Sequence, residues 1–414
     1  MENKEHQHHH SDHHHHSDHH HHSDHHHHHR HHSHHHSHHS HRRRKVIIAV
    51  SLALLAALLV IAVAVELLGN KNSDSPTEEA ASGFLQIEVI NSEGLLVQDA
   101  VMEYLQLDMS NSKNADVLVS SFLSGTERLD AQIPVALKLS VKDCRAYFYK
   151  IELADNVFFA RSEVFYLERE SGVYEFKHLY ASKTYYYRVT VYTDAGVDSL
   201  TGEFTTADTP RILSIDGLFN VRDIGNWQTD SGKRVSQGLL IRGTEMDGAV
   251  VSKYSLTSEG MMVMLNMLGI KSEFDLRKET DASKDSLGAQ VEHNYYDMAL
   301  YEEIFTNKGK EKVKSLFVDL ANPDNYPIYL HCTYGSDRSG TVCFLLEALL
   351  GVSREDCYKD YGLSNLSFEK LQRVEDGLRA YEGDTLKEQV EAYLLSCGVS
   401  EAQIESIRNI FLGD

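Results

Sequence analysis

The sequence predicts an α/β domain in the C-terminal half of the chain, an all-β sandwich before it and one membrane-spanning helix near the N-terminus. Residues 46–65 form an apolar run, residues 84–206 hold many short alternating segments, and residues 211–414 alternate short apolar stretches with segments of helical periodicity. We therefore expect a histidine-rich disordered tail (1–45), a transmembrane helix (46–68), a linker (69–83), a β-sandwich (84–210) and the α/β domain (211–414).

The tail is dominated by histidine, with 25 of the 28 histidines of the chain in residues 1–41. Dense neutral imidazoles bind transition metals, so we expect weak metal sites in the tract from His13 to His29. An expression tag and a solubilising tail that gains charge on acidification are the alternatives.

The apolar run is long enough to cross a bilayer, because 20 helical residues at about 1.5 Å each span its roughly 30 Å hydrocarbon core. Four basic residues, 42–45, precede it. The positive-inside rule then places the N-terminus in the cytoplasm and everything after the helix outside. A cleaved signal peptide is the alternative, although its apolar region is usually only about 7 to 15 residues long. We expect a single-pass protein of the cell membrane with an extracytoplasmic catalytic domain.

Charge and cysteine content exclude several classes of partner and scaffold. The whole chain has a formal net charge of −21, and residues 1–45 carry +1. The remaining residues therefore carry −22. Such an acidic exterior repels nucleic acids and anionic lipid headgroups, and we expect neither as a partner. Five cysteines in 414 residues indicate no disulfide framework.

The segments 135–141, 147–153 and 185–192 alternate apolar and polar residues, as strands of a β-sandwich do. The sandwich serves either as a spacer or as a binder of a cell-surface ligand. In the α/β domain we expect strands at 239–242, 272–276, 293–297 and 326–331, and helices at 256–268, 310–320, 338–350, 367–380, 386–396 and 401–411. The charged segment 301–325 suggests a mobile cover.

One loop carries the chemistry: Cys332 stands six residues before Arg338, between a predicted strand and a predicted helix. There the backbone N–H groups of the loop can form an anion-binding nest, and the helix N-terminus adds positive charge. The loop residues are Thr333, Tyr334, Gly335 and Ser336. The same field favours the Cys332 thiolate, and this arrangement indicates a phosphatase.

Each remaining group near the loop has a candidate role. The Arg338 guanidinium would hold two phosphoryl oxygens, and Ser339 would donate a hydrogen bond to the sulfur. Asp337 is either the general acid or a residue that caps the helix. His331 would support the loop. We expect no cofactor and no metal in the catalytic site.

The loop His-Cys-x-x-Gly-x-Asp-Arg-Ser-Gly resembles the bacterial tyrosine and phosphoinositide phosphatases of the cysteine-dependent protein tyrosine phosphatase superfamily. Segments 219–225, 238–243 and 269–277 resemble the opening segments of that family in the right order, and residues 360–365, beyond the loop, also resemble the family. The resemblance implies that Asp337 is the general acid. Arg222, Asp223 and Arg277 are expected to form ion pairs beneath the loop. Members that act on phosphoinositides commonly carry a lysine where this chain has Ser336, which favours phosphotyrosine or another monoester.

The sandwich has a resemblance of its own. Leu179 followed by Tyr185, and then the segment 202–206, resemble the last strands of a fibronectin type III domain with its tyrosine corner. The sequence as a whole therefore predicts a membrane-anchored phosphomonoesterase, a protein tyrosine phosphatase acting through a cysteinyl-phosphate, whose substrate is a phosphorylated protein or a small phosphomonoester. The alternatives are a phosphoinositide or inositol-phosphate phosphatase, and a phosphate-ligand binding module with a metal-binding histidine tail.

Overall fold

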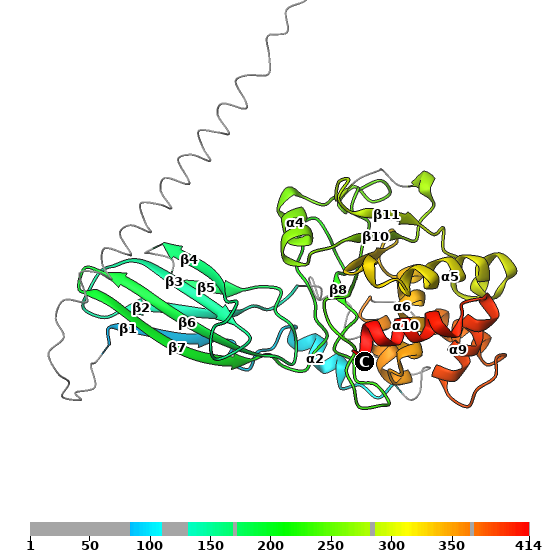
Figure 1. Ribbon diagram of the computed structural model, residues 1–414, viewed down its shortest axis with the longest axis horizontal. Coiled ribbons are helices and arrows are strands. Elements are labelled where there is room, and N and C mark those ends of the chain that lie inside the picture. The colour runs from blue at the N-terminus through cyan, green and yellow to red at the C-terminus, as the bar shows by residue number, and fades with distance from the viewer. Residues whose placement is uncertain (1–82, 110–130, 169–171, 282–285, 365–367, 414) are drawn as a thin grey trace, which may run out of the picture. The chain divides into compact units, whose positions relative to one another are not determined.

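The computed structural model describes residues 83–109, 131–168, 172–281, 286–364 and 368–413 (Figure 1). These residues belong to one compact unit, Ser82–Asp414. The predicted transmembrane helix and the His13 to His29 tract lie outside the described residues. Among the residues that are described, no helix is both long and apolar enough to cross a membrane.

Two antiparallel sheets share one core in the N-terminal part of this unit. One sheet has the order β1-β2-β5 and the other β4-β3-β6-β7. The strands are β1 (Leu85–Ile90), β2 (Val135–Val141), β3 (Ala146–Ala154), β4 (Glu163–Glu168), β5 (Val173–Phe176), β6 (Thr184–Thr193) and β7 (Gly196–Thr205). Strand β6 alternates strictly, with Tyr185, Tyr187, Val189 and Val191 buried, because successive side chains of a strand point to opposite faces.

A helix between β1 and β2 leaves this sandwich. Helix α2 (Asp99–Leu105) places Tyr104 in the main core of the α/β domain, and the Tyr104 hydroxyl donates a hydrogen bond to the Lys359 carbonyl at 2.8 Å. Val101 packs with Ile212, which follows the sandwich in sequence. The described part of the β1–β2 connection thus contributes Leu96 to the core of the sandwich and Tyr104 to the core of the α/β domain.

The α/β domain is built on a five-stranded sheet of order β11-β10-β12-β9-β8, in which only the edge strand β8 is antiparallel to its neighbour. The strands are β8 (Arg222–Asp223), β9 (Leu240–Gly243), β10 (Ser272–Asp275), β11 (Glu292–Tyr295) and β12 (Ile328–His331). Four of them, β9 to β12, were predicted. Strands β9 and β12 are largely apolar, as strands covered on both faces usually are, whereas β10 (SEFD) and β11 (EHNY) carry polar and charged residues.

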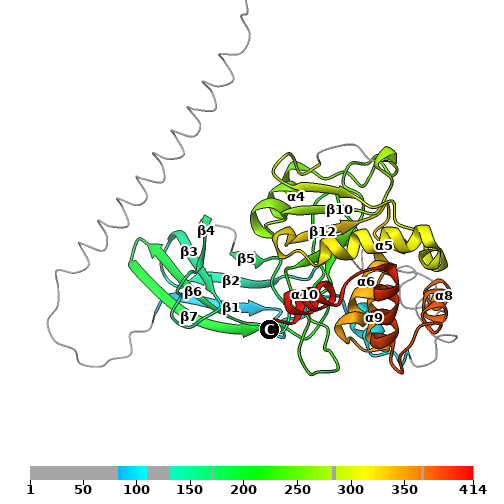
Figure 2. The same ribbon diagram turned by 45° about the vertical axis from the view of Figure 1, so that its right-hand side comes forward.

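Helices cover the two faces with separate cores. Leu240, Phe274 and Leu330 point into the larger core, whereas Ile241 and Tyr329 point into the smaller one. Helix α6 packs against α7, α9 and α10 on the larger side (Figures 1 and 2). The helical elements are α4 (Ser258–Met262), continued by a π-helical turn (Val263–Met267), α5 (Asn307–Leu320), α6 (Asp337–Leu350), α7 (Arg354–Gly362), α8 (Phe368–Leu378), α9 (Leu386–Cys397) and α10 (Glu401–Leu412), with short 3-10 turns at Glu279–Asp281, Tyr301–Phe305 and Pro323–Asn325.

The segment 301–325 does not form the expected mobile cover. It folds mainly as α5, whose residues Val313, Leu316, Phe317 and Leu320 lie in the larger core. The charges that suggested a cover occupy the other side of this amphipathic helix, where solvent accepts them.

Candidate active site

The predicted loop lies between β12 and α6. Cys332 follows the last residue of β12 and is only 3% exposed, while the amide of Gly340 closes the first turn of α6 onto the Ser336 carbonyl. Gly335 adopts φ +65°, and a Cβ atom there would lie 2.4 Å from the Gly243 carbonyl oxygen. Only glycine fits this turn, which brings the loop against the end of the adjacent strand β9.

The Cys332 thiol is poised to ionise. Burial raises its pKa, but the Ser339 side chain, the Arg338 charge and the backbone amides of Ser339 and Tyr334 together lower the pKa of Cys332 below that of a free thiol. The Ser339 hydroxyl is fully buried and has no hydrogen bond of ordinary geometry to another described residue. Its proton is therefore available to the sulfur beside it.

Arg338 is anchored and half-buried. Its Nη1 donates to the Leu276 carbonyl at 3.1 Å, at the end of β10. This bond uses one of the five N–H donors of the guanidinium, so the fork keeps donors for an oxyanion while its charge acts on Cys332.

Two arginines and one aspartate brace the loop from below. Arg242 donates through Nη2 to the carbonyls of Gly335 (3.0 Å) and Ser336 (3.4 Å). Its Nη1 bonds Asp360 Oδ2 at 2.7 Å, and Asp360 also binds Arg222 at 2.9 Å. With these carbonyls held toward Arg242, the intervening peptide N–H groups are free to face the anion site.

Of the expected ion pairs, only Arg222 joins this brace. Asp223 instead pairs with Arg211 at 2.9 Å, next to the sandwich, whereas Arg277 binds Asp275 at 2.7 Å in a second group of buried charges beneath the loop. Sequence reasoning missed Arg242 and Asp360 as site residues. A detectable signal was present in Arg242, a charged residue inside the otherwise apolar strand β9.

Asp337 opens α6 and is engaged by two neighbours. Its Oδ1 accepts a hydrogen bond from the Tyr301 hydroxyl and lies 3.2 Å from Lys370 Nζ. The Asp337 side chain is 28% exposed. Burial and the bond to Asp337 raise the pKa of Tyr301, so Tyr301 remains the donor and Asp337 the acceptor.

His331 lies wholly inside the domain. Its Nε2 is 2.9 Å from Glu273 Oε1, and its Nδ1 is 3.3 Å from the Cys332 carbonyl oxygen. Burial lowers the pKa of His331, but the charges of Asp275 and Glu273 outweigh this and raise it. These contacts place His331 under the loop, where it can support the backbone but cannot reach a substrate.

Aromatic rings gather beside the loop. Tyr334, 52% exposed, meets Tyr254 edge-on with ring centroids 6.1 Å apart, and Phe219 lies 5.4 Å from Tyr254. The Lys253 ammonium is 5.3 Å from the Phe219 ring centroid. Asn220 donates to the Tyr334 carbonyl at 3.2 Å and so ties this wall to the loop.

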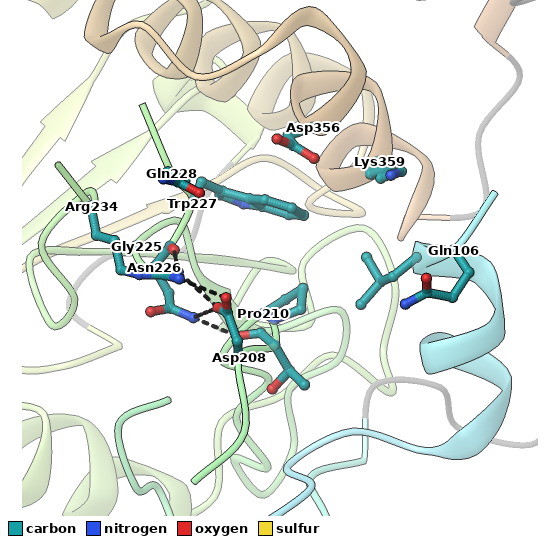
Figure 3. A pocket seen from close by; sticks show the side chains of 12 residues that line it. Gln106, Asp208, Pro210, Gly225, Asn226, Trp227, Gln228, Arg234, Asp356 and Lys359 are labelled. Atoms are coloured by element: carbon teal, nitrogen blue, oxygen red, sulfur yellow. Dashed lines mark hydrogen bonds and ion pairs between the residues drawn. The ribbon is translucent and has the colours of Figure 1, made fainter. Parts of the chain in front are cut away.

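A separate cavity of about 230 Å³ lies between α2, α7 and the segment that joins the sandwich to the α/β domain (Figure 3). The Trp227 indole crosses it, between Asp356 and Lys359 on one side and Asp208 and Pro210 on the other. None of the residues that line the cavity belongs to the loop 332–338, so it is not the phosphate site.

The loop has the arrangement that the sequence predicts for a cysteine-dependent phosphatase. Residues 213–413 match the model of the tyrosine phosphatase family. Among solved structures, one match is the core catalytic domain of the PP-IP phosphatase SIW14 from S. cerevisiae, in complex with citrate. It is 18% identical, covers 37% of this chain and 88% of its own, and has a TM-score of 0.28. No curated protein matches the chain.

Proposed function

We propose that this protein is a phosphomonoesterase that acts through a cysteinyl-phosphate and that it prefers phosphotyrosine. One observation carries the proposal: a buried cysteine of lowered pKa stands at the base of a loop whose carbonyls are turned away by Arg242, with Arg338 at its other end. Such a loop stabilises a dianion at the sulfur.

The reaction follows from these positions. The Cys332 thiolate attacks phosphorus while the P–O bond to the substrate breaks, and Arg338 with the loop amides holds the phosphoryl oxygens. Water then attacks the cysteinyl-phosphate, and the P–S bond breaks to return the thiolate. The Ser339 hydroxyl stabilises that leaving sulfur. The net reaction converts a phosphomonoester and water into an alcohol and inorganic phosphate.

Asp337 is the proposed proton carrier. It would protonate the leaving oxygen in the first step and take a proton from water in the second. Tyr301 and Lys370 both contact its Oδ1, which leaves Oδ2 to carry the proton. Asp337→Asn should therefore slow alkyl phosphates more than p-nitrophenyl phosphate, whose leaving group needs little protonation. An equal loss for both substrates would assign Asp337 a purely structural role at the start of α6.

The aromatic wall supports an aryl phosphate as substrate. Tyr334 lies two residues after the nucleophile and, with Tyr254 and Phe219, offers rings against which a phenyl group can pack. A polyphosphorylated inositol would need several cations beside the loop. Ser336 supplies none, and the Lys253 ammonium is packed on the Phe219 and Tyr254 rings. Tyr334→Ala should raise KM for phosphotyrosyl peptides about 10-fold and leave inositol phosphates unaffected; the reverse pattern would favour an inositol-phosphate phosphatase.

The nucleophile is tested in the full chain. Cys332→Ser should abolish hydrolysis of p-nitrophenyl phosphate while phosphate and vanadate still bind, because the loop amides remain. Cys144→Ser is the matched control, since Cys144 lies in the sandwich, and its activity should stay at the wild-type level. Substantial turnover by Cys332→Ser would defeat the proposal, and a wild type that binds phosphate without turnover would favour a binding module.

We also propose that residues 84–210 are a fibronectin type III domain. Two features support this. The described residues of this range form seven strands in sheets of three and four, and the Tyr185 hydroxyl accepts a hydrogen bond from the Tyr180 amide at 2.9 Å, as in a tyrosine corner. Anchoring in the cell membrane by residues 46–68, with the catalytic domain outside and a metal-binding tail inside, is proposed from the sequence alone. Protease protection in sealed vesicles would test the orientation.

A further inference from the structure

Beneath the active-site loop lies a cluster of buried ionisable groups that the proposed hydrolysis does not use. Four carboxylates surround one guanidinium, and each of these five side chains is 3% exposed or less. Two imidazoles complete the cluster. Its members are Glu245, Asp247, Glu273, Asp275, Arg277, His293 and His331.

The formal charge of the cluster is strongly negative. Four carboxylates and one guanidinium leave three negative charges without compensation when the imidazoles are neutral, and one when both imidazoles are protonated. Burying uncompensated charge is unfavourable by several kcal/mol per ion. Arg277 forms hydrogen bonds to Glu245, Asp247 and Asp275. None of these bonds involves Glu273, the fourth carboxylate. The site needs further positive charge.

Strand register brings the donor atoms together. Glu273 and Asp275 are two residues apart on β10 and therefore project from the same face. His293 on β11 stands opposite Glu273, and His331 on β12 stands opposite Asp275. The convergence follows from the parallel pairing of three strands.

The distances resemble those between ligands that share one ion. One donor atom from each of Glu273, Asp275 and His293 lies within 4.8 Å of the others. His293 Nε2 is 3.1 Å from Glu273 Oε1 and 3.9 Å from Asp275 Oδ2. Despite this proximity, the buried His293 Nε2 has no hydrogen bond of acceptable geometry to the residues that the structure describes. The nitrogen approaches the carboxylate without pointing a proton at it.

We propose that Glu273, Asp275 and His293 form a binding site for a divalent transition metal of the zinc class, with His331 Nε2 beside it as a further donor. Mixed imidazole and carboxylate donors suit Zn²⁺ better than Mg²⁺ or Ca²⁺, which take oxygen ligands. The ion would supply two of the missing positive charges. Arg277 bonds to Asp275, so this carboxylate has an outer contact of the kind that orients metal ligands.

The site is reachable and its histidine is held in place. Strand β11 is an edge strand of the sheet, and the His293 side chain is 14% exposed. Tyr295 stacks on the imidazole with centroids 4.3 Å apart, and its hydroxyl lies 3.5 Å from His293 Nδ1. A bound ion would tie β10 and β11 to β12, directly before Cys332. It would stabilise the sheet beneath the loop and take no part in phosphoryl transfer.

The test compares the full chain with its His293→Gln and Glu273→Gln variants, all of which carry the same N-terminal histidine tract. After equilibrium dialysis against Zn²⁺, the wild type should retain one more equivalent of zinc than either variant. At a zinc concentration 100-fold above the dissociation constant, its unfolding midpoint should rise by about 5 °C, against no rise for the variants. Mg²⁺ at the same concentration is the control metal.

Two results would overturn the proposal. Equal zinc content in wild type and variants would show that protons on His293 and His331 supply the compensating charge. If neither variant folds, the wild type alone decides, because an unfolding midpoint that Zn²⁺ moves no further than Mg²⁺ would exclude the site. Both readouts are independent of hydrolysis, so failure of the proposed phosphatase activity would leave this result interpretable.

Discussion

Replacing Asp360 by asparagine is the sharpest test of the brace beneath the loop. The three side chains of the brace, Arg222, Asp360 and Arg242, are 3% exposed or less. Asp360→Asn keeps the shape but removes the negative charge that pairs with both guanidiniums. Burial raises the pKa of Asp360, and the two arginines lower it below its usual value, so the native group is an anion.

The expected loss is large. One guanidinium and one carboxylate 4 Å apart interact by about 4 kcal/mol at an effective dielectric constant of about 20, and breaking a buried pair by removing one partner typically costs about 3–5 kcal/mol. We expect Asp360→Asn to lower the free energy of unfolding by that amount. Because Arg242 also holds the Gly335 and Ser336 carbonyls, vanadate affinity should fall as well.

Urea unfolding followed by circular dichroism measures the first effect, and inhibition of p-nitrophenyl phosphate hydrolysis by vanadate measures the second. Glu369→Gln is the control, since Glu369 and its partner Arg373 are 73% and 51% exposed and solvent screens such a pair, so its loss should leave stability nearly unchanged. A loss below about 1 kcal/mol for Asp360→Asn would refute the charge argument. A large loss with unchanged vanadate affinity would refute the link to the loop.

Three further outcomes are expected. Burial and the Asp360 charge raise the pKa of Glu347 well above its usual value, so folding takes up a proton at neutral pH, and the free energy of unfolding falls by up to about 1.4 kcal/mol per pH unit as the pH rises above about 4.3. In Glu347→Gln, urea unfolding from about pH 5 to 8 should show a smaller decline in this free energy. An unchanged decline would contradict the assignment of Glu347 as a buried neutral acid. Ser339→Ala should slow hydrolysis of the cysteinyl-phosphate on the order of 10²-fold. This effect would appear as a burst of p-nitrophenol followed by slow turnover. Loss of the burst itself would mean that Ser339 acts in the attack of Cys332 on the substrate. Tyr104→Ala should lower the free energy of unfolding by about 3–5 kcal/mol. The control Tyr166→Ala, on the exposed side of β4, should change it little. If both variants change the free energy of unfolding equally little, α2 is not part of the core.

The sequence was most informative where function depends on neighbouring residues. Cys332 to Ser339 form one continuous motif, and the flanking apolar strand and helix are local patterns, so the loop and most elements of the α/β domain were predictable. Arg242 and Asp360 are 118 residues apart, and no local signal pairs them. The short strand β8 and the polar helix α7 lack the periodicity that identifies longer elements. Likewise, Glu273 and His293 meet only through strand register.

Helix α2 shows that the two domains cannot be separated at a single position in the sequence. It precedes most strands of the sandwich in the chain, yet it packs in the core of the α/β domain. A fragment beginning near residue 211 would contain the entire family match, yet it would lack Tyr104 and Met109, which the native core encloses completely. Such a fragment would expose an apolar hollow beside α7 and invite aggregation. The sandwich cannot be exchanged for another domain by simple recombination, because any replacement domain would also have to supply apolar side chains that fill that hollow.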